Sequence, residues 1–380
     1  MLPLRRPGEA RQLTSIPGGV GDMYWSAATG HIYFSSAVYV DATAQTQGNS
    51  DPISATAARD AAAAESGVGA ILYRRLPVRS WDRWLDAKMP HVFELRLRQE
   101  AVGLASSGSS AWVVEDAAAP PTDLMAGVAT ACPTAPFGGV EDYSISGTHV
   151  ALSCRPELCL DEAWTTTRHI YVAPLPGRDA AASGGEALVG CKITGLGNCL
   201  TADNLGYDLN PSVSPDGRML AWLSMCTPQY EADAARIKVH DLATSTTRTL
   251  AADWDYSPGD LCWSRDGGRL LFAANIRSRN ALCAINVASG ILTVLVADGH
   301  NSLCTETADG QLVYKHSSLQ APDELWMCNA DGTGQRQLTF LNTDALQGLH
   351  LGRAEELTFR GAHNEEVHAW LVRPAGFSGA

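Results

Sequence analysis

A polar turn followed by an apolar strand recurs along this chain. The pattern is clearest in Val213-Ser-Pro-Asp-Gly-Arg-Met-Leu-Ala-Trp222, and it returns in residues 263–272 and 307–314, with weaker copies that begin at Trp25 and Tyr143. Asp-Gly favours a tight hairpin, because glycine tolerates positive φ and the aspartate can bond back to its own turn. Each copy therefore predicts a β-hairpin whose outgoing strand is apolar.

A further strand follows each of the three clear turns at a regular distance. It begins at Ile237, 20 residues after Gly217, and 15 residues after Gly267 and Gly310. The turn glycines are 50 and 43 residues apart, close to the roughly 40–50 residues of one propeller blade. We therefore predict an all-β protein, a β-propeller of seven or eight four-stranded blades stacked around an axis. The alternative is a β-sandwich, whose strands would be spaced by about 8–12 residues without this longer period.

Two segments depart from the repeat. Residues 40–70 are rich in alanine, threonine, serine and glutamine, and we predict an insertion in an early blade there. Within it, Ala55–Ser66 is expected to form a short helix, because alanine is the best helix former. After residue 356 the chain leaves the repeat register. We therefore predict a propeller over residues 1–356 and a separate segment over residues 357–380, with a strand at Val367–Pro374.

The composition excludes several kinds of partner. Among 380 residues, 28 lysines and arginines stand against 41 aspartates and glutamates, a net charge of −13, and no basic run exceeds two residues. Nucleic-acid surfaces need clustered positive charge, and an acidic surface is a poor partner for anionic lipid. No apolar run has the length of a signal-peptide core or of the ~20 residues that span a membrane. We expect no nucleic-acid or membrane partner, a cytoplasmic location, and ten cysteines that are mostly buried free thiols.

Recognisable catalytic motifs are absent from these residues. The sequence has no G-x-S-x-G, no P-loop and no three-glycine dinucleotide motif. His363-Asn-Glu-Glu-Val-His368 is superficially similar to a zinc motif, but its spacing is neither HExxH nor HxxEH and it runs into a predicted strand. We therefore predict no catalytic residue, no metal site and no cofactor.

Two clusters combine acidic and aromatic residues in long connections between strands. They are Asp161-Glu162-Ala163-Trp164 and Tyr230-Glu231-Ala232-Asp233. Acidic side chains beside aromatic rings can bind the ammonium group of a ligand. The alternative is a pair of blade-edge loops held together by their own side-chain hydrogen bonds.

Several motifs resemble the propeller of the prolyl oligopeptidase family, in its dipeptidyl-peptidase V and acylaminoacyl-peptidase branch. These motifs are Ser214–Trp222, Asp253–Pro258, Leu338–Asn342, Leu76–Trp84 and Pro136–Asp142. Residues 355–377 resemble the junction that leads into the family's catalytic domain. The resemblance extends from about residue 12 to residue 377.

The resemblance implies an α/β-hydrolase domain with a Ser-Asp-His triad beside the propeller. The 380 residues contain neither the His-Gly-Gly oxyanion segment nor a nucleophile elbow. Whether the chain counts as an enzyme is therefore left open: it resembles a serine-type peptidase, but alone it is predicted to be inactive. We expect a truncated peptidase, in which residues 357–380 supply the junction and the first strand of the absent hydrolase domain.

For the propeller, the resemblance implies gating of short peptides and recognition of their N-terminal end. Glu162 and Glu231 would bind the ammonium group, with Trp164, Tyr230 and Arg155 as neighbours. The expected partners are short peptides and the hydrolase domain. Two alternatives remain, a stand-alone propeller that acts as a scaffold or binding protein, and an enzyme with unrecognised chemistry.

Overall fold

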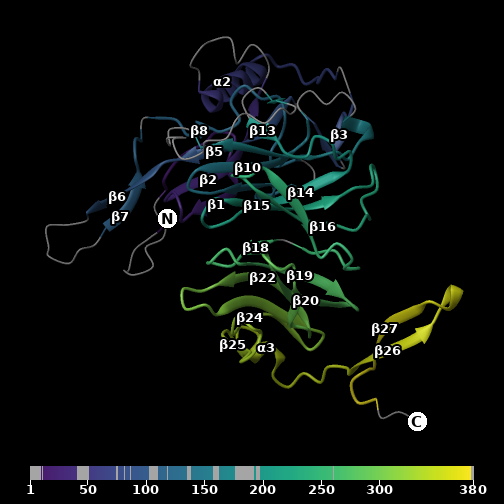
Figure 1. Cartoon of the computed structure of the whole chain (residues 1–380). Helices are drawn as coiled ribbons and strands as arrows, with labels where there is room; N and C mark the ends of the chain where they lie inside the picture. Colours follow the sequence, from purple (N-terminus) through teal and green to yellow (C-terminus); the bar gives the residue numbers. More distant parts are fainter. Residues whose placement is uncertain are drawn as a thin grey trace. The chain divides into compact units, whose positions relative to one another are not determined.

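The chain is built mainly from antiparallel β-sheets (Figure 1). A computed structural model describes residues 10, 12–40, 51–73, 76–80, 82–85, 87–101, 110–117, 119–134, 138–156, 162–175, 192–193, 197–259 and 261–377. The chain divides into two compact units, Met1–Asp233 with His240–Thr246, and Ala234–Val239 with Thr247–Ala380. No helix in the described ranges is both long and apolar enough to cross a membrane.

The first sheet of the first unit has four strands in the order β1-β2-β5-β8. Its strands are β1 (Gly21–Ser26), β2 (His31–Tyr39), β5 (Lys88–Leu95) and β8 (Thr122–Asp123). Between β2 and β5 lies α2 (Pro52–Glu65), which Asp51 caps by accepting hydrogen bonds from two backbone amides. The predicted short helix is thus confirmed, with its start three residues earlier than expected. The two-stranded pairs β3 (Arg79–Ser80) with β4 (Arg83–Trp84), and β6 (Leu97–Ala101) with β7 (Ser110–Val114), complete this part.

The second sheet of the first unit follows the order β12-β13-β11-β10-β9. Its elements are η1 (Val140–Asp142), β9 (Tyr143–Ile145), β10 (His149–Cys154), η2 (Glu162–Trp164), β11 (His169–Pro174), β12 (Lys192–Ile193) and β13 (Gly197–Cys199). It has one strand more than the four predicted, because the short β12 pairs with β13. The next repeat contributes the antiparallel pair β14 (Tyr207–Val213) and β15 (Met219–Met225), followed by β16 (Arg236–Asp241) and β17 (Thr246–Leu250). The division between the two units falls within β16 and β17.

The second unit contains two antiparallel quartets, joined into one eight-stranded sheet by a parallel contact between β20 and β22, and a terminal hairpin. The quartets are β18 (Cys262–Trp263), β19 (Arg269–Ile276), β20 (Arg279–Asn286) and β21 (Leu292–Val296), then β22 (His300–Glu306), β23 (Leu312–Ser318), β24 (Ala321–Cys328) and β25 (Arg336–Gln337). After them come α3 (Thr343–Leu346), β26 (Ala354–Arg360), η4 (Ala362–Asn364) and β27 (Glu366–Val372). Several four-stranded antiparallel sheets are therefore confirmed, while the number of blades stays a prediction.

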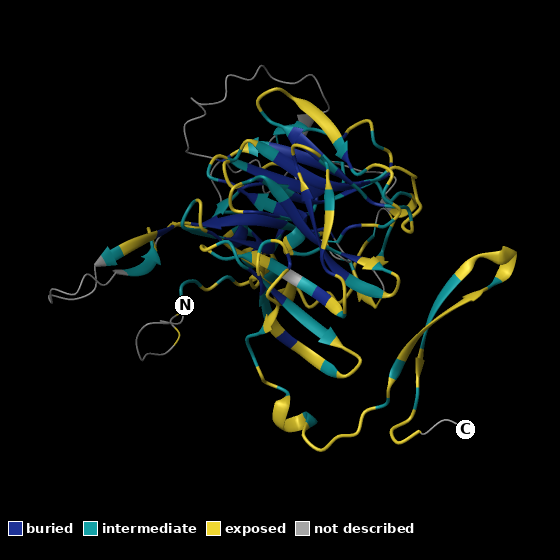
Figure 2. Cartoon of the chain, turned by 60° about the horizontal axis from the view of Figure 1, so that its bottom comes forward, coloured by how far each residue is buried: buried dark blue, intermediate teal, exposed yellow. Residues whose placement is uncertain are grey.

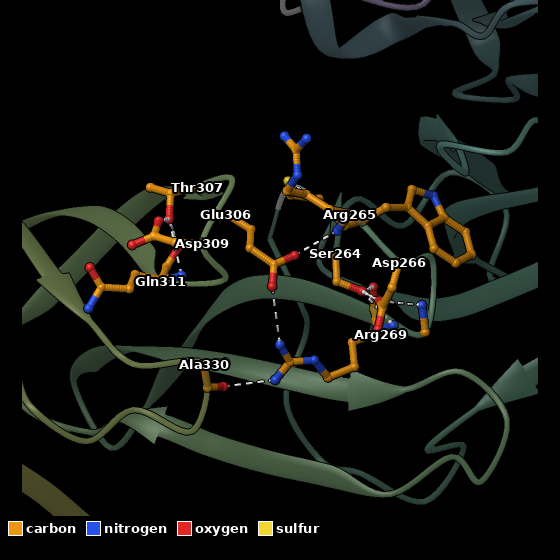
Figure 3. A network of polar contacts seen from close by, with 12 residues as sticks. Ser264, Arg265, Asp266, Arg269, Glu306, Thr307, Asp309, Gln311 and Ala330 are labelled. Atoms are coloured by element: carbon orange, nitrogen blue, oxygen red, sulfur yellow. Dashed lines mark hydrogen bonds and ion pairs between the residues drawn. The ribbon is translucent and has the colours of Figure 1, made fainter.

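The predicted Asp-Gly turns share one local structure. Asp266 accepts a hydrogen bond from the Ser264 hydroxyl at 2.6 Å, and Asp309 accepts one from Thr307 at the same distance (Figure 3). The glycine that follows has a φ of +70° at Gly267, a value that side chains with a Cβ rarely adopt. The turn chemistry read from the sequence is thus what joins the first two strands of these repeats.

Buried side chains gather between consecutive sheets and not in one central core. One such cluster joins the two sheets of the first unit, and another joins the two quartets of the second. Their members include Tyr33, Val92, Tyr143, Leu152 and Tyr171 in the first unit, and Leu271, Leu282, Leu295, Leu312 and Tyr314 in the second. Figure 2 shows buried residues, coloured dark blue, along the strands of the sheets. Face-to-face packing of successive four-stranded sheets is the way in which propeller blades are stabilised.

The terminal hairpin β26–β27 is largely exposed (Figure 2). The two strands pair from Ala354 with Val372 to Arg360 with Glu366. The exposed fractions of Leu357, Phe359 and Val372 are 42, 52 and 55%. The sequence predicted the second strand, and the structure pairs it with a first strand that begins at Ala354.

Candidate functional site

The ends of three strands in the first unit, β10, β11 and β14, carry two arginines and Tyr207. Arg155 directly follows β10, Arg168 directly precedes β11, and Tyr207 is the first residue of β14. Because β10 and β11 are antiparallel neighbours, the end of one and the start of the other lie at the same edge. Tyr207 reaches that edge through a parallel bridge to Arg168. We call Asp142, Arg155, Arg168, Tyr207 and Glu231 the Tyr207 site.

A buried ion pair lies at the base of the Tyr207 site. Arg168 donates from Nη1 to both carboxylate oxygens of Asp142 at 2.8 and 3.0 Å, and from Nη2 to the Thr134 carbonyl at 3.0 Å. Asp142 also accepts from the Thr134 amide at 2.9 Å. Both side chains are at least 95% buried. Burial raises the pKa of the Asp142 carboxyl to about 6, although Arg168 and the Thr134 amide oppose the shift.

Tyr207 connects this ion pair to the outer residues of the site. The Arg168 guanidinium lies over the Tyr207 ring, 4.9 Å from its centroid. Burial raises the pKa of the Tyr207 hydroxyl, the charges of Arg168 and Arg155 lower it, and those of Asp142 and Glu231 raise it. All four charged groups are therefore close enough to act on one phenol oxygen.

The first acidic and aromatic loop is tied to this site through Arg155. The Arg155 Nη1 atom donates to the Thr165 carbonyl at 2.8 Å, directly after the η2 turn that contains Glu162 and Trp164. Trp164 is 68% exposed. The backbone of Glu162 belongs to η2, but its side chain lies outside the described residues.

The second acidic and aromatic loop follows β15 and is closed by Asp233. The Asp233 carboxylate accepts from the amides of Cys226 and Thr227 at 2.9 and 2.8 Å. This closure leaves Tyr230 56% exposed, and Glu231 is exposed beside it. The charges of Arg155 and Glu231 therefore both act on the pKa of Tyr207, in opposite directions; Trp164 lies on the loop that Arg155 contacts, and Tyr230 is the neighbour of Glu231 in the chain.

Three members of the Tyr207 site were not predicted from the sequence. Asp142 ends a motif, Pro136–Asp142, that was noted only for its family resemblance, and the first two residues of that motif, 136 and 137, lie outside the described ranges. Arg168 and Tyr207 stand directly before a strand and at the start of one. A charged or aromatic residue at a strand end, beside a long loop, is the local signal that could have found them.

The arrangement suits a ligand with both positive and neutral polar groups. Asp142 and Arg168 neutralise one another, whereas Glu231 is an exposed anion on the loop after β15 and Arg155 is a cation at the end of β10. A carboxylate can pair with an ammonium group while a guanidinium donates to a carbonyl oxygen. In the part of the chain that the structure describes, no group of three or more His, Cys, Asp or Glu side chains could hold a metal ion.

Sequence comparison finds relatives of which this chain covers less than half. Dipeptidyl-peptidase 5 of Porphyromonas gingivalis is 24% identical over 304 residues, which cover 80% of this chain and 40% of the relative. Probable dipeptidyl-peptidase 5 of Arthroderma benhamiae is 28% identical over 338 residues, which cover 84% of this chain and 42% of the relative. The chain thus spans about 40% of the length of these relatives. No protein-family model matches the chain.

Structural comparison finds a similar fold in part of a peptidase. The uncomplexed acylaminoacyl peptidase of Pyrococcus horikoshii matches with a TM-score of 0.56 at 12% identity, over 93% of this chain and 44% of the peptidase. The chain is thus similar in sequence to dipeptidyl-peptidase 5 and in fold to the matching part of acylaminoacyl peptidase. These are the two kinds of peptidase that the sequence motifs predicted as its relatives.

Proposed function

We propose that this chain is the non-catalytic propeller portion of a serine exopeptidase of the dipeptidyl- or acylaminoacyl-peptidase type. In this role it gates short peptides and orients them by their N-terminal end for a Ser-Asp-His hydrolase domain. The proposal depends above all on the similarity of the chain to dipeptidyl-peptidase 5. It is supported by Arg155 at the end of β10 and by Glu231, exposed on the loop after β15, whose charges both act on Tyr207. A free peptide N-terminus is an ammonium group two bonds from a carbonyl, and these two side chains match those two groups.

The terminal hairpin fits the same proposal. Its exposed apolar residues, among them Leu357 and Phe359, would be covered by the hydrolase domain, and residues 357–380 would form the junction with it. An apolar sheet surface exposed to water is unfavourable until another element packs on it. The hairpin is thus the expected place of contact between the propeller and the catalytic domain.

The proposed role of Glu231 predicts a measurable preference for free N-termini. We expect the chain to bind Ala-Phe amide more tightly than N-acetyl-Ala-Phe amide in isothermal titration calorimetry. The substitution Glu231→Gln should weaken binding of the free peptide by roughly 2- to 5-fold, the upper range of a solvent-accessible charge pair. Binding of the acetylated peptide should not change, because it has no ammonium group for the carboxylate to pair with.

Glu65 at the end of α2 offers a matched control, since it is also an exposed glutamate. Glu65→Gln should leave binding of both peptides as in the unmodified chain. Equal binding of the free and acetylated peptides would contradict N-terminal recognition. Hydrolysis of an Ala-Phe chromogenic amide by the purified chain would contradict the non-catalytic role.

A further inference from the structure

A cavity of about 450 Å³ lies in the second unit, lined by residues of β18, β19, β20 and β22 and of the segment that precedes β18. Apolar side chains dominate its walls, including Leu271, Leu282 and Phe272, together with the small side chain of Ala273. None of the described residues that line it is charged. Pockets that hold small molecules have volumes of roughly 300–1,000 Å³ and mainly apolar walls with a few polar groups.

Hydrogen bonds near both ends of β19 join the two quartets around this cavity and fix the distance between them. At one end, Asn280 donates to the Asn301 carbonyl and Asn301 donates to the Asn280 carbonyl, each at 2.8 Å. At the other end, Arg269 donates to the Ala330 carbonyl at 2.8 Å, and Glu306 accepts from the backbone amide of the turn beside it (Figure 3). Because both ends are held, the cavity is part of the folded structure and does not need a ligand to form.

Ser302 gives the cavity a polar group with no partner of its own. It lies on β22 and lines the cavity, and its hydroxyl oxygen is buried without a hydrogen bond. An unpaired buried hydroxyl is unfavourable by about 1–3 kcal/mol. Rotation about the Cα–Cβ bond of Ser302 breaks no hydrogen bond, so the hydroxyl can turn toward a molecule in the cavity.

We propose that this cavity binds a small uncharged molecule, apolar over most of its surface and about the size of two fused rings, with one hydroxyl group. The uncharged apolar walls exclude ions and strongly polar ligands, which would lose their hydration without compensation. The single unpaired group at Ser302 favours a ligand with one hydrogen-bonding group. This site is independent of the peptide-binding role proposed above, because all of its described residues belong to the second unit.

The role of Ser302 is tested with two probes that differ only in a hydroxyl, 2-naphthol and naphthalene. Ligand-observed NMR titration should show saturable binding of both to the full chain. Ser302→Ala should weaken binding of 2-naphthol by roughly 3- to 10-fold and leave naphthalene unchanged. Because Ser302 has no hydrogen bond to lose, the variant should also unfold at a temperature no lower than that of the unmodified chain.

The position of the site is tested with Ala273→Leu. Ala273 pairs with Leu282 across the strands and therefore points to the same face, so a larger side chain there fills the cavity and should abolish binding of both probes. Ala288→Leu, at an exposed turn position, is the matched control and should bind both as before. Near-ultraviolet circular dichroism establishes that each variant is folded. The proposal would be overturned if neither probe bound saturably to the unmodified chain, or if both probes bound folded Ala273→Leu as tightly as the unmodified chain. The role of Ser302 would be overturned if Ser302→Ala changed the binding of 2-naphthol and naphthalene equally.

Discussion

Replacing Arg168 with methionine should lower the free energy of unfolding by about 3–5 kcal/mol at pH 7. The substitution keeps most of the apolar length of the side chain but removes the cation that faces Asp142. Both partners are almost fully buried, so the remaining carboxylate would be left charged in a poorly hydrated place. Thr134 would retain its hydrogen bond to Asp142 but lose the one from Arg168. Urea unfolding followed by circular dichroism measures the loss.

The penalty of Arg168→Met should shrink as the pH falls from 7 to 5. Burial already raises the pKa of Asp142 from 3.8 to about 6 in the folded protein. Without Arg168 that pKa should be higher still, because the charge that opposes the shift is gone. The folded state then binds a proton that the unfolded state has released, so stability falls as the pH rises through this window. Below it, a neutral Asp142 no longer needs the cation.

A solvent-exposed arginine provides the control for this prediction. Arg98 forms an ion pair with Glu100, and the two side chains are 51 and 43% exposed. Arg98→Met should change the free energy of unfolding by less than about 1 kcal/mol, with little dependence on pH. If Arg168→Met were no more destabilising than Arg98→Met, the ion pair would not be the structural base of the Tyr207 site.

The repeat could be predicted from the sequence because its signal is local. A hydroxyl residue, an aspartate and a glycine within four positions define each clear turn, and the structure places a hairpin at Gly217, Gly267 and Gly310. The strand expected at a fixed distance after each turn is also present, as β16, β20 and β24. The pair of β6 with β7 was missed, because it interrupts the first sheet between β5 and β8 without a turn motif of that kind.

The Tyr207 site could be predicted only in part. Glu231 and Tyr230 were recognised because acidic and aromatic residues are adjacent in the sequence, and Arg155 was named only as a neighbour that the family resemblance implies. Asp142 and Arg168 are 26 residues apart, and their pairing depends on how η1 packs beside the start of β11. Sequence patterns report turns and periodicity, whereas a buried pair at such a separation depends on tertiary packing.

Gly332→Ala should destabilise the second unit by about 2–5 kcal/mol, because two costs add at this position. Gly332 belongs to an Asp-Gly turn and has a φ of +84°, which is unfavourable for alanine by about 1–2 kcal/mol. A Cβ at Gly332 would also overlap the carbonyl oxygen of Leu295 on β21, in the preceding quartet. Backbone cannot move aside as a flexible side chain can, so the contact between the quartets would have to open.

Gly310 separates these two costs. It lies in an equivalent Asp-Gly turn with a φ of +80°, but a Cβ there would meet no atom within 4 Å. Gly310→Ala should therefore show the backbone cost alone, about 1–2 kcal/mol, and the difference between the two variants measures how tightly successive quartets pack. Urea unfolding of both variants provides that difference. Equal destabilisation would mean that the turn at Gly332 does not pack on β21 in solution. A larger loss at Gly332 would mean that these sheets are held together as propeller blades are, by close face-to-face contact with the next.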